Sequence, residues 1–399
     1  MSTVRRPAQT RNTRPTGGDQ SLLRRINLGA ALVRFRSGAA TVAQVGDTIG
    51  VSRTSAQQIV NQLVELRWVT AEKPVPPSTP QIGPAPRRFR FRSEAGYVAG
   101  VDLGRHRIRA VVADLGGEPL ASSTVEIGPG AGPIERLQAA RAVVEACCQR
   151  ARLRYSQVWV VAAGARGVIH KGRVVAAGGM PNWTGLDLEH ELRAVLDRPV
   201  LVGNDCNIAT VGEHWRGAGT DTGSLVNVAA GQSIGAGIMI DGTLLTGFAG
   251  YASEIHHLPF LRWRGAAARL KADPSEEVDI KAVFDQARAG STSAQERVED
   301  YARVLAEGIA TIIATVDPEL VVIGGGLSAS GATLLEPVRR HLTPLTARMP
   351  RLELSPLGAD AVTLGAIRIA LNHVDTLIDA AADRLDDFPK PLRRVIAAS

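Results

Sequence analysis

The sequence has few cysteines and no long apolar run, and both absences narrow its class. Its three cysteines, Cys147, Cys148 and Cys206, make no CxxC pair and no even set for a disulfide framework, so we expect a protein of the reducing cytoplasm. No apolar stretch reaches the roughly 18–20 residues that span a bilayer. The charged first 20 residues lack the apolar core of a secretory signal, so neither membrane insertion nor secretion is expected.

Aromatic residues and lysine are also scarce. Aromatic side chains make up 4% of the chain, and arginine outnumbers lysine, which indicates GC-rich coding and a bacterial source. The 399 residues are 45% hydrophobic and 21% charged, a globular composition that excludes a disordered or collagen-like chain. At roughly 150 residues for each domain, this length predicts two or three domains.

Positive charge gathers in the first quarter of the sequence. The whole chain has a formal net charge of +7, whereas residues 1–92 hold 15 Lys and Arg against 4 Asp and Glu, a net charge of +11. The remainder therefore has a net charge of −4. A basic head on a mildly acidic body is typical of a nucleic-acid-binding domain joined to a separate body. A basic surface that meets only solvent is the alternative.

Residues 21–66 show the pattern of a helix-turn-helix. A first helix is expected from Ser21 to about Gly38, and Thr41 is placed to cap a short second helix. Gly50 stands where the turn needs a left-handed residue, which glycine adopts without steric cost. Ser52 then caps a third helix that runs to about Leu66. Apolar residues recur at helical spacing in all three: Leu22, Leu23, Ile26, Ala30 and Val33; Val42, Val45 and Ile49; Ile59, Leu63 and Leu66.

The third helix has a polar face suited to DNA. Asn and Gln side chains pair with adenine edges, Arg binds guanine or phosphate, and hydroxyl groups contact phosphate. A packing module of three helices without a DNA partner is the alternative. The residues expected to contact DNA from this face are Ser52, Arg53, Thr54, Gln57, Gln58 and Asn61.

Two alternating stretches after the third helix predict a wing. Residues 68–70 and 88–91 alternate as two strands, and the proline-rich stretch 74–86 between them forms the tip, because proline cannot join a ladder. Arg88 and Arg90 on the returning strand are expected to contact DNA. The head is therefore interpreted as a winged helix-turn-helix.

Three strand-and-glycine patterns follow from Tyr97 onward. Glycine turns after strands let backbone N–H groups approach a phosphate. Two such hairpins, followed by a strand, three glycines and a helix, resemble the two-lobed, ribonuclease H-like fold of actin and sugar kinases, so the class is α/β. The strands are expected at 97–104, 108–114 and 320–323, a strand-turn element at 225–240, and the intervening helices at 133–148, 186–196 and 299–315.

Seven motifs make the resemblance specific. Together they resemble the ROK family of repressors, open reading frames and sugar kinases over roughly residues 22–370, in particular its repressor branch of xylose and N-acetylglucosamine regulators. Their order and spacing are more specific than any one motif. They are Val101–Gly104, Gly179–Trp183, Gly203–Asn207, Gly231–Asp241, Glu254–His257, Asp317–Gly326 and Leu364–Ala366.

The resemblance implies a division of the chain into a head and a two-lobed body. We expect a disordered basic arm over residues 1–20 and the winged helix-turn-helix over 21–92. A small lobe would span 97–205 with a C-terminal helix at about 376–399, and a large lobe 206–375.

The resemblance also implies a sugar site. The catalytic base of the family's kinases follows an asparagine, and Asn204-Asp205 matches that pair, so Asp205 is expected to be a relic of the base. A carboxylate beside a carboxamide can accept from and donate to vicinal sugar hydroxyls. Glu254 and His257 match the family's Glu-Ile-Gly-His, although His256 replaces the glycine. Arg166 and Asn182 are placed only by their positions in neighbouring loops.

The ATP and zinc features of the family are altered. Its kinases read Asp-x-Gly-Gly-Thr-Lys, whereas this chain has Asp102 to Arg107 as Asp-Leu-Gly-Arg-His-Arg, and Gln232-Ser233 replaces a second Thr-Gly. Phosphoryl transfer depends on positioning, so loss of kinase activity is expected; the alternative is that the arginines near the turn hold a phosphate instead. No cysteines follow His257, and two adjacent histidines do not supply about four zinc ligands. Neither a metal nor a cofactor is expected.

The sequence thus predicts a sugar-responsive transcriptional regulator, most simply a repressor of carbohydrate uptake or catabolism genes. Its partners would be operator double-stranded DNA, a sugar or sugar phosphate, and a second copy in a homodimer, with pairing into tetramers left open. It would act in the bacterial cytoplasm at the nucleoid, without a membrane. The alternatives are an active carbohydrate kinase with a DNA-binding head, and a regulator whose body binds a protein partner.

Overall fold

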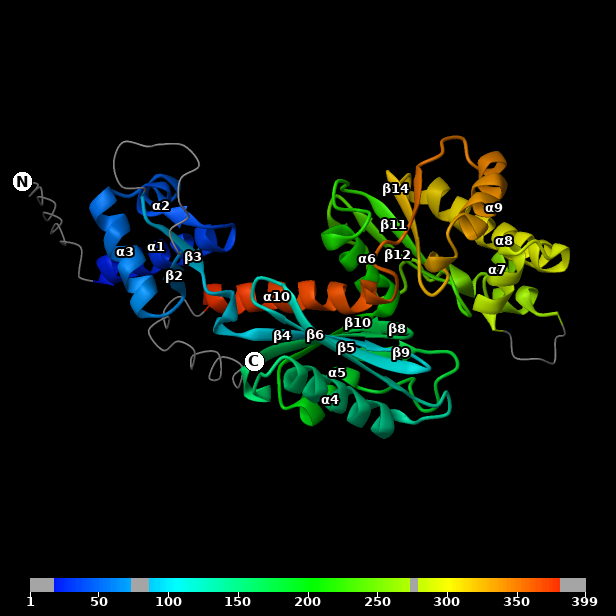
Figure 1. Cartoon of the computed structure of the whole chain (residues 1–399), viewed down its shortest axis with the longest axis horizontal. Coiled ribbons are helices and arrows are strands. Elements are labelled where there is room, and N and C mark those ends of the chain that lie inside the picture. Colours follow the sequence, from blue (N-terminus) through cyan, green and yellow to red (C-terminus); the bar gives the residue numbers. More distant parts are fainter. Residues whose placement is uncertain (1–17, 73–85, 273–278, 381–399) are drawn as a thin grey trace, which may run out of the picture. The chain divides into compact units, whose positions relative to one another are not determined.

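The computed structural model describes residues 18–72, 86–272 and 279–380, coloured along the chain in Figure 1. The chain divides into two compact units, which we call the head (residues 1–95 with 376–399) and the body (residues 96–375). Most of the expected basic arm and of the wing tip lies outside the described residues. Gly18–Gln20 are already helical, so the arm expected over 1–20 ends earlier than predicted.

The head is a winged helix-turn-helix, as expected. Its three strands form an antiparallel sheet in the order β1-β3-β2, and Trp68 stacks on Phe91 with ring centroids 6.4 Å apart. The elements are α1 (Gly18–Arg36), β1 (Ala40–Thr41), α2 (Val42–Ile49), α3 (Arg53–Glu65), β2 (Val69–Ala71) and β3 (Arg88–Phe91).

Local signals in the sequence set the bounds of α2 and α3. Thr41 and Gln44 form a capping box at the start of α2. Gly50 ends that helix with φ 71° and ψ 35°, the left-handed conformation that the turn requires. Ser52 caps α3 by accepting a hydrogen bond from the Ser55 N–H at 3.2 Å. A Cβ on Gly46 would lie 3.3 Å from the Ala56 Cβ, so a small residue here permits the close approach of α2 and α3.

The buried face of α1 differs from the apolar positions singled out in the sequence. Leu23, Ile26 and Val33 are more than half exposed, so their helical spacing predicted the helix but not its packing. Other residues one turn apart point into the head core. They are Leu28, Ala31, Leu32 and Phe35.

The body contains two five-stranded sheets with the same order and directions. Three antiparallel strands continue into two parallel ones in each sheet, the pattern of a ribonuclease H-like duplication. The first sheet runs β10-β7-β4-β5-β6, from β4 (Tyr97–Leu103), β5 (Arg107–Asp114), β6 (Pro119–Glu126), β7 (Val158–Ala165) and β10 (Val200–Asn204). The second runs β13-β12-β11-β14-β15, from β11 (Leu225–Ala229), β12 (Gly235–Ile240), β13 (Thr243–Leu244), β14 (Leu320–Gly324) and β15 (Arg351–Leu354).

Helices cover both faces of each sheet. On the first sheet, α4 (Pro133–Arg150) and α5 (Leu188–Leu196) lie opposite α10 (Ala361–Ala380). On the second, α6 (Asp205–Arg216) covers one face. The other face of the second sheet packs on α7 (Ile280–Arg288), α8 (Thr292–Val316) and α9 (Ala332–Leu342). A short hairpin of β8 (Val168–His170) and β9 (Arg173–Ala176) follows β7.

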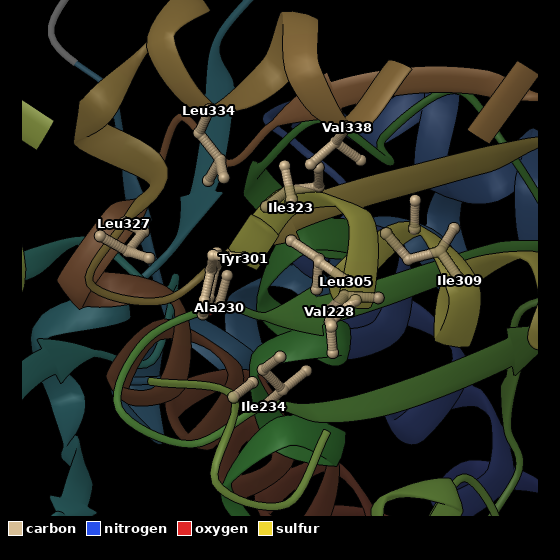
Figure 2. Packing of buried hydrophobic residues seen from close by; sticks show 14 of the residues in the cluster. Val228, Ala230, Ile234, Tyr301, Leu305, Ile309, Ile323, Leu327, Leu334 and Val338 are labelled. Carbon is tan, nitrogen blue, oxygen red and sulfur yellow. The ribbon is translucent and has the colours of Figure 1, made fainter. Parts of the chain in front are cut away.

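The core under the second sheet fixes the turn after β11. Figure 2 shows Tyr301 of α8 beside Ala230, with Leu305 and Ile309 further along the same helix. Tyr301 is fully buried among these aliphatic residues. The turn that begins at Ala230 therefore packs on the aromatic ring of Tyr301.

Helix α10 differs from the sequence-based expectations in two respects. Its residues from Ala361 onward pack on β4 and β7 of the first sheet, because Gly100 and Gly164 leave room for Thr363 and Val362. The first lobe therefore gains 361–375, which the sequence assigned to the large lobe, while residues from Thr376 belong with the head. The stretch Gly358–Ile378 is also apolar and long enough to span a membrane, contrary to the expectation of no such run, but 56% of it is buried as in a core helix.

We expect Gly100→Ala to destabilise the body by about 3 kcal/mol or more, because the new Cβ would lie 2.1 Å from the Thr363 carbonyl oxygen and backbone cannot move aside cheaply. Gly130→Ala is the matched control: nothing lies within 4 Å of its Cβ position, so its effect should stay within about 0.5 kcal/mol. Urea denaturation followed by tryptophan fluorescence measures both. Equal stabilities of the two variants would contradict this packing of α10.

Candidate functional site

Parallel pairing brings three strand ends of the first sheet to one edge. Leu103 of β4 pairs with Ala165 of β7, and Ala165 pairs with Asn204 of β10. Asp102, Arg166 and Asp205 lie within one residue of these aligned positions. Because side chains at the carboxyl ends of parallel strands gather at the same edge, the sheet assembles two carboxylates and a guanidinium that are far apart in sequence.

Both carboxyl groups have a raised pKa, and burial is the main cause for each. Burial and the charge of Asp205 raise the pKa of Asp102 to about 7, against the opposing charges of Arg107, Arg109 and Arg166. Burial also raises the pKa of Asp205, although Arg166 and the Cys206 N–H, which donates to Asp205 Oδ1 at 2.9 Å, lower it. A carboxyl group in this state can accept a proton or a hydroxyl hydrogen bond near neutral pH.

Asn204 has a structural role that the motif did not reveal. It is the N-cap of α6: its Oδ1 accepts from the Asn207 N–H at 3.0 Å, and its Nδ2 donates to the Gly167 carbonyl oxygen at 3.0 Å. The side chain is buried. These bonds hold Asp205 at the first position of the helix, so Asn204 positions the carboxylate, and one N–H remains for a ligand.

Arg166 links the two sheets of the body beside these carboxylates. Its Nη2 donates to Ser233 Oγ, 2.7 Å away in the turn between β11 and β12. In the same turn, the Gly231 N–H donates to the Tyr301 hydroxyl, and that hydroxyl donates to the Gly231 carbonyl oxygen, both at 3.1 Å. The backbone N–H of Gly231 is therefore already used within the protein.

The imidazole of His256, rather than that of His257, pairs with the Glu254 carboxylate; His257 contacts Glu254 through its backbone N–H, which donates to the Glu254 carbonyl oxygen at 3.2 Å. The His256 Nδ1 lies 3.0 Å from Glu254 Oε2, while His257 is exposed and its ring centroid lies 4.1 Å from that of His256. The three side chains each bring one ligand atom within 4.8 Å of the others. They offer three of the four ligands of a structural zinc site, and the described residues contribute no fourth Cys, His, Asp or Glu to the group. The absence of a structural metal stays a prediction.

Asn182 lies exposed in a left-handed conformation, with φ 55°, in the loop before the buried Trp183. The structure ties this loop to the turn after β4 through Gly179, whose Cβ position lies 3.5 Å from Arg105 Nη1. Arg105, which replaces a glycine of the family's kinases, therefore lies beside this loop.

The head has a groove of about 520 Å³ between α3 and the base of the wing. Both helices of the motif and both long strands of the wing line it, and no acidic side chain does. Its lining residues are Thr41, Val42, Ala43, Arg53, Gln57, Asn61, Val64, Thr70, Ala71, Pro86, Arg87 and Phe89.

All six residues predicted on α3 and its cap are exposed, and three of them line the groove. Arg53, Gln57 and Asn61 follow each other at helical spacing, and Gln57 Nε2 donates to Asn61 Oδ1 at 2.9 Å. Ser52, Thr54 and Gln58 are exposed but do not line it.

Arg88 and Arg90, which are expected to contact DNA, form ion pairs within the head, and their contact with DNA stays a prediction. Arg88 pairs with Glu72 at 3.2 Å and donates to the Ala39 carbonyl oxygen, and Arg90 pairs with both oxygens of Glu94 at 3.1 Å. Arg87, which the sequence pattern did not single out, lines the groove, and its guanidinium lies 5.4 Å from the Phe89 ring centroid. Glu72 and Glu94 lie outside β3, so the alternation of residues along this strand did not indicate which arginines form ion pairs.

We expect the free energy of unfolding of the Asp102→Asn variant to fall less with rising pH than that of the wild-type protein. The folded protein holds a proton on Asp102 that the unfolded chain releases above 3.8, so the wild-type protein loses stability as the pH rises from about 4 to about 7. The full loss is at most about 4 kcal/mol, at about 1.4 kcal/mol for each pH unit in that window. Urea denaturation at pH 5 and pH 8 measures it. An equal pH slope in wild type and variant would contradict the burial of this carboxyl group.

Comparisons with known proteins agree with this architecture. A glucokinase of Halalkalibacterium halodurans is 30% identical over 220 residues, which cover 46% of this chain and 67% of the glucokinase. The xylose repressor of Caldicellulosiruptor bescii is 22% identical over 395 residues, covering 90% of this chain and 98% of the repressor. A solved ROK family transcriptional regulator, a homolog of the E. coli MLC protein, has a TM-score of 0.68 at 20% identity and covers 90% of this chain and 98% of its own.

The family itself is settled by a direct match. The ROK family model matches residues 98–263 and 263–373, which is more than half of the chain. This confirms the resemblance that the seven motifs indicated, and the structure confirms the α/β fold with a sugar-kinase-like body and an N-terminal helix-turn-helix. The chain belongs to the ROK family.

Proposed function

We propose that the protein is a sugar-responsive transcriptional repressor that binds operator DNA through its head and a sugar through its body, without phosphorylating the sugar. The observation that carries this proposal is the groove beside α3, which combines Arg53, Arg87 and hydrogen-bonding side chains without an acidic residue. The likeness to the xylose repressor supports it, because 90% coverage extends beyond the family match at 98–373 and so includes part of the head.

The chemistry of the groove suits one strand of a DNA duplex. Two guanidinium groups at its sides can neutralise phosphates, and the Gln57–Asn61 pair keeps free amide groups for base edges. A helix-turn-helix places its third helix in the major groove, and a homodimer would bind two half-sites of a palindromic operator. We place this activity in the bacterial cytoplasm, on nucleoid DNA.

The sugar would lie at the edge of the first sheet, held by Asp205, Arg166 and Asn182, with the remaining N–H of Asn204. Glu254 and one of the two histidines that follow would complete the set from the second sheet. The raised pKa of Asp205 favours hydrogen bonding to sugar hydroxyls. Binding can change DNA affinity only if the sugar prefers one of two arrangements of the protein.

Loss of kinase activity is supported by both glycine turns. Arg105 replaces the glycine that admits a phosphate in the kinases that the sequence resembles, and Gly231 and Ser233 in the second turn already bond to Tyr301 and Arg166. Phosphoryl transfer needs preorganised contacts at every phosphate. The second candidate function is an active carbohydrate kinase, favoured by Asp205 and by the likeness to a glucokinase.

Replacing Arg53 or Arg87 by Ala should weaken operator binding and reduce the dependence of log K on log salt by about one unit for each lost phosphate contact. Arg88→Ala is the matched control, at the residue next to Arg87: Arg88 already pairs with Glu72, so its loss should leave both quantities unchanged. Fluorescence anisotropy at several salt concentrations measures them. If Arg88→Ala weakens binding more than Arg87→Ala, DNA does not follow the groove.

Asp205→Ala should leave DNA affinity unchanged and abolish its response to sugar, because the carboxylate lies in the body and none of its contacts involves the head. Anisotropy of the operator complex, titrated with sugars, compares the variant with wild type. A normal response of the variant would move the sugar site elsewhere. Sugar-dependent ATP consumption by the wild-type protein at ordinary kinase rates would favour the kinase instead.

A further inference from the structure

The four amide side chains of α3 have different surroundings. Gln62 is bound within the head, because the Arg24 guanidinium donates to its Oε1 from Nε at 2.9 Å and from Nη2 at 2.7 Å. Gln58 is exposed and lies outside the groove. Gln57 and Asn61 line the groove and lie one helical turn apart. Two of the four amides therefore lie on the proposed DNA surface.

A hydrogen bond between these two amides gives them unequal roles. Gln57 Nε2 donates to Asn61 Oδ1 at 2.9 Å, which uses one N–H of Gln57 and one lone pair of Asn61. Gln57 keeps its Oε1 acceptor and a second N–H on the same planar group. It therefore presents a donor beside an acceptor, in an orientation that the bond to Asn61 fixes.

A donor beside an acceptor matches one base in the major groove. Adenine offers the N7 acceptor beside the N6 amino donor. Guanine offers two acceptors there, thymine one acceptor and a methyl group, and cytosine one amino donor. With any base other than adenine, either the Oε1 or the free N–H of Gln57 stays without a partner. A bidentate contact of this amide therefore selects an A·T pair in one orientation.

The walls of the groove make an unmatched amide costly. Val64, Ala71 and Phe89 line the same groove as Gln57 with apolar surface. DNA that fills the groove displaces water from these side chains, so water cannot complete a hydrogen bond that the base does not make. A desolvated polar group without a partner loses more free energy than a typical hydrogen bond gains. The discrimination between bases thus comes mainly from the penalty at the wrong base.

We propose that Gln57 recognises an adenine in each half-site of the operator, and that Asn61 is a positioning residue that orients the Gln57 amide. This inference rests on the proposed function, because it names the base that the DNA-binding groove recognises. Arg53 and Arg87 line the same groove, and their attraction to phosphates would raise affinity without choosing this base pair.

The test starts with selection of DNA duplexes from a random library by the full-length protein and by its variants. We expect the wild-type protein to select adenine at one position of each half-site, and Gln57→Ala to lose the preference at that position. Gln57→Glu should prefer cytosine there, because a carboxylate accepts from the N4 amino group.

Anisotropy at fixed salt then measures affinity for the selected duplex. Replacing the adenine by 7-deazaadenine, which lacks the N7 acceptor, should weaken binding of the wild-type protein about fivefold or more. The same replacement should leave binding of Gln57→Ala unchanged. Gln58→Ala is the matched control, an adjacent residue of the same type outside the groove, and it should keep the preference for adenine.

Two variants test the positioning role of Asn61. Asn61→Asp keeps the oxygen that accepts from Gln57 and should keep the preference for adenine, whereas Asn61→Leu removes that oxygen and should reduce the preference. The measured quantity is the ratio of affinities for adenine and for the other bases, because the added negative charge of the aspartate weakens binding to every sequence. Equal ratios for the two variants would overturn the positioning role.

The inference is overturned if no selected adenine depends on Gln57, if 7-deazaadenine is tolerated, or if Gln58→Ala reduces the preference more than Gln57→Ala does. Sequence-specific binding without such an adenine would retain the DNA-binding regulator and overturn this inference alone. A wild-type protein that binds no duplex would overturn the proposed function, and this inference with it.

Discussion

The functional site of the body depends on the parallel pairing of β4, β7 and β10. That pairing aligns Leu103, Ala165 and Asn204 at one edge, so Asp102, Arg166 and Asp205 meet although more than a hundred residues separate the first from the last. Gly100 and Gly164 in these strands admit α10 on one face of the sheet. The strands that carry the charged groups are thus the strands that the C-terminal helix holds in place.

Two buried side chains give the two glycine turns opposite properties. Arg136 binds the carbonyl oxygens of the first turn and leaves its N–H groups open, whereas Tyr301 uses both the N–H and the carbonyl of Gly231 in the second. A fold that is symmetrical in strand order therefore has chemically unequal turns.

In the head, ion pairs decide which basic residues are available. Glu72 and Glu94 engage Arg88 and Arg90, and they leave Arg53 and Arg87 along the groove. The net charge of residues 1–92 indicated a polyanionic partner, but it could not assign that role to individual arginines. Net charge favours a polyanionic partner in general, whereas the ion pairs inside the head determine which guanidinium groups already have a carboxylate partner.

The sequence by itself determined the family, the two-sheet α/β body and the winged helix-turn-helix, because these follow from local signals: the capping residues Thr41 and Ser52, the left-handed Gly50, and strands that end in glycine. It also singled out Asp205, which the structure places at the edge of the first sheet, and the polar face of α3, which is exposed. Only the tertiary structure decided the partners of side chains. The structure shows four features that periodicity and spacing did not predict. They are the pairing of His256 with Glu254, the capping role of Asn204, the buried face of α1, and the surroundings of Arg87 and Arg105. Each depends on how side chains pack in three dimensions, which a sequence pattern does not specify.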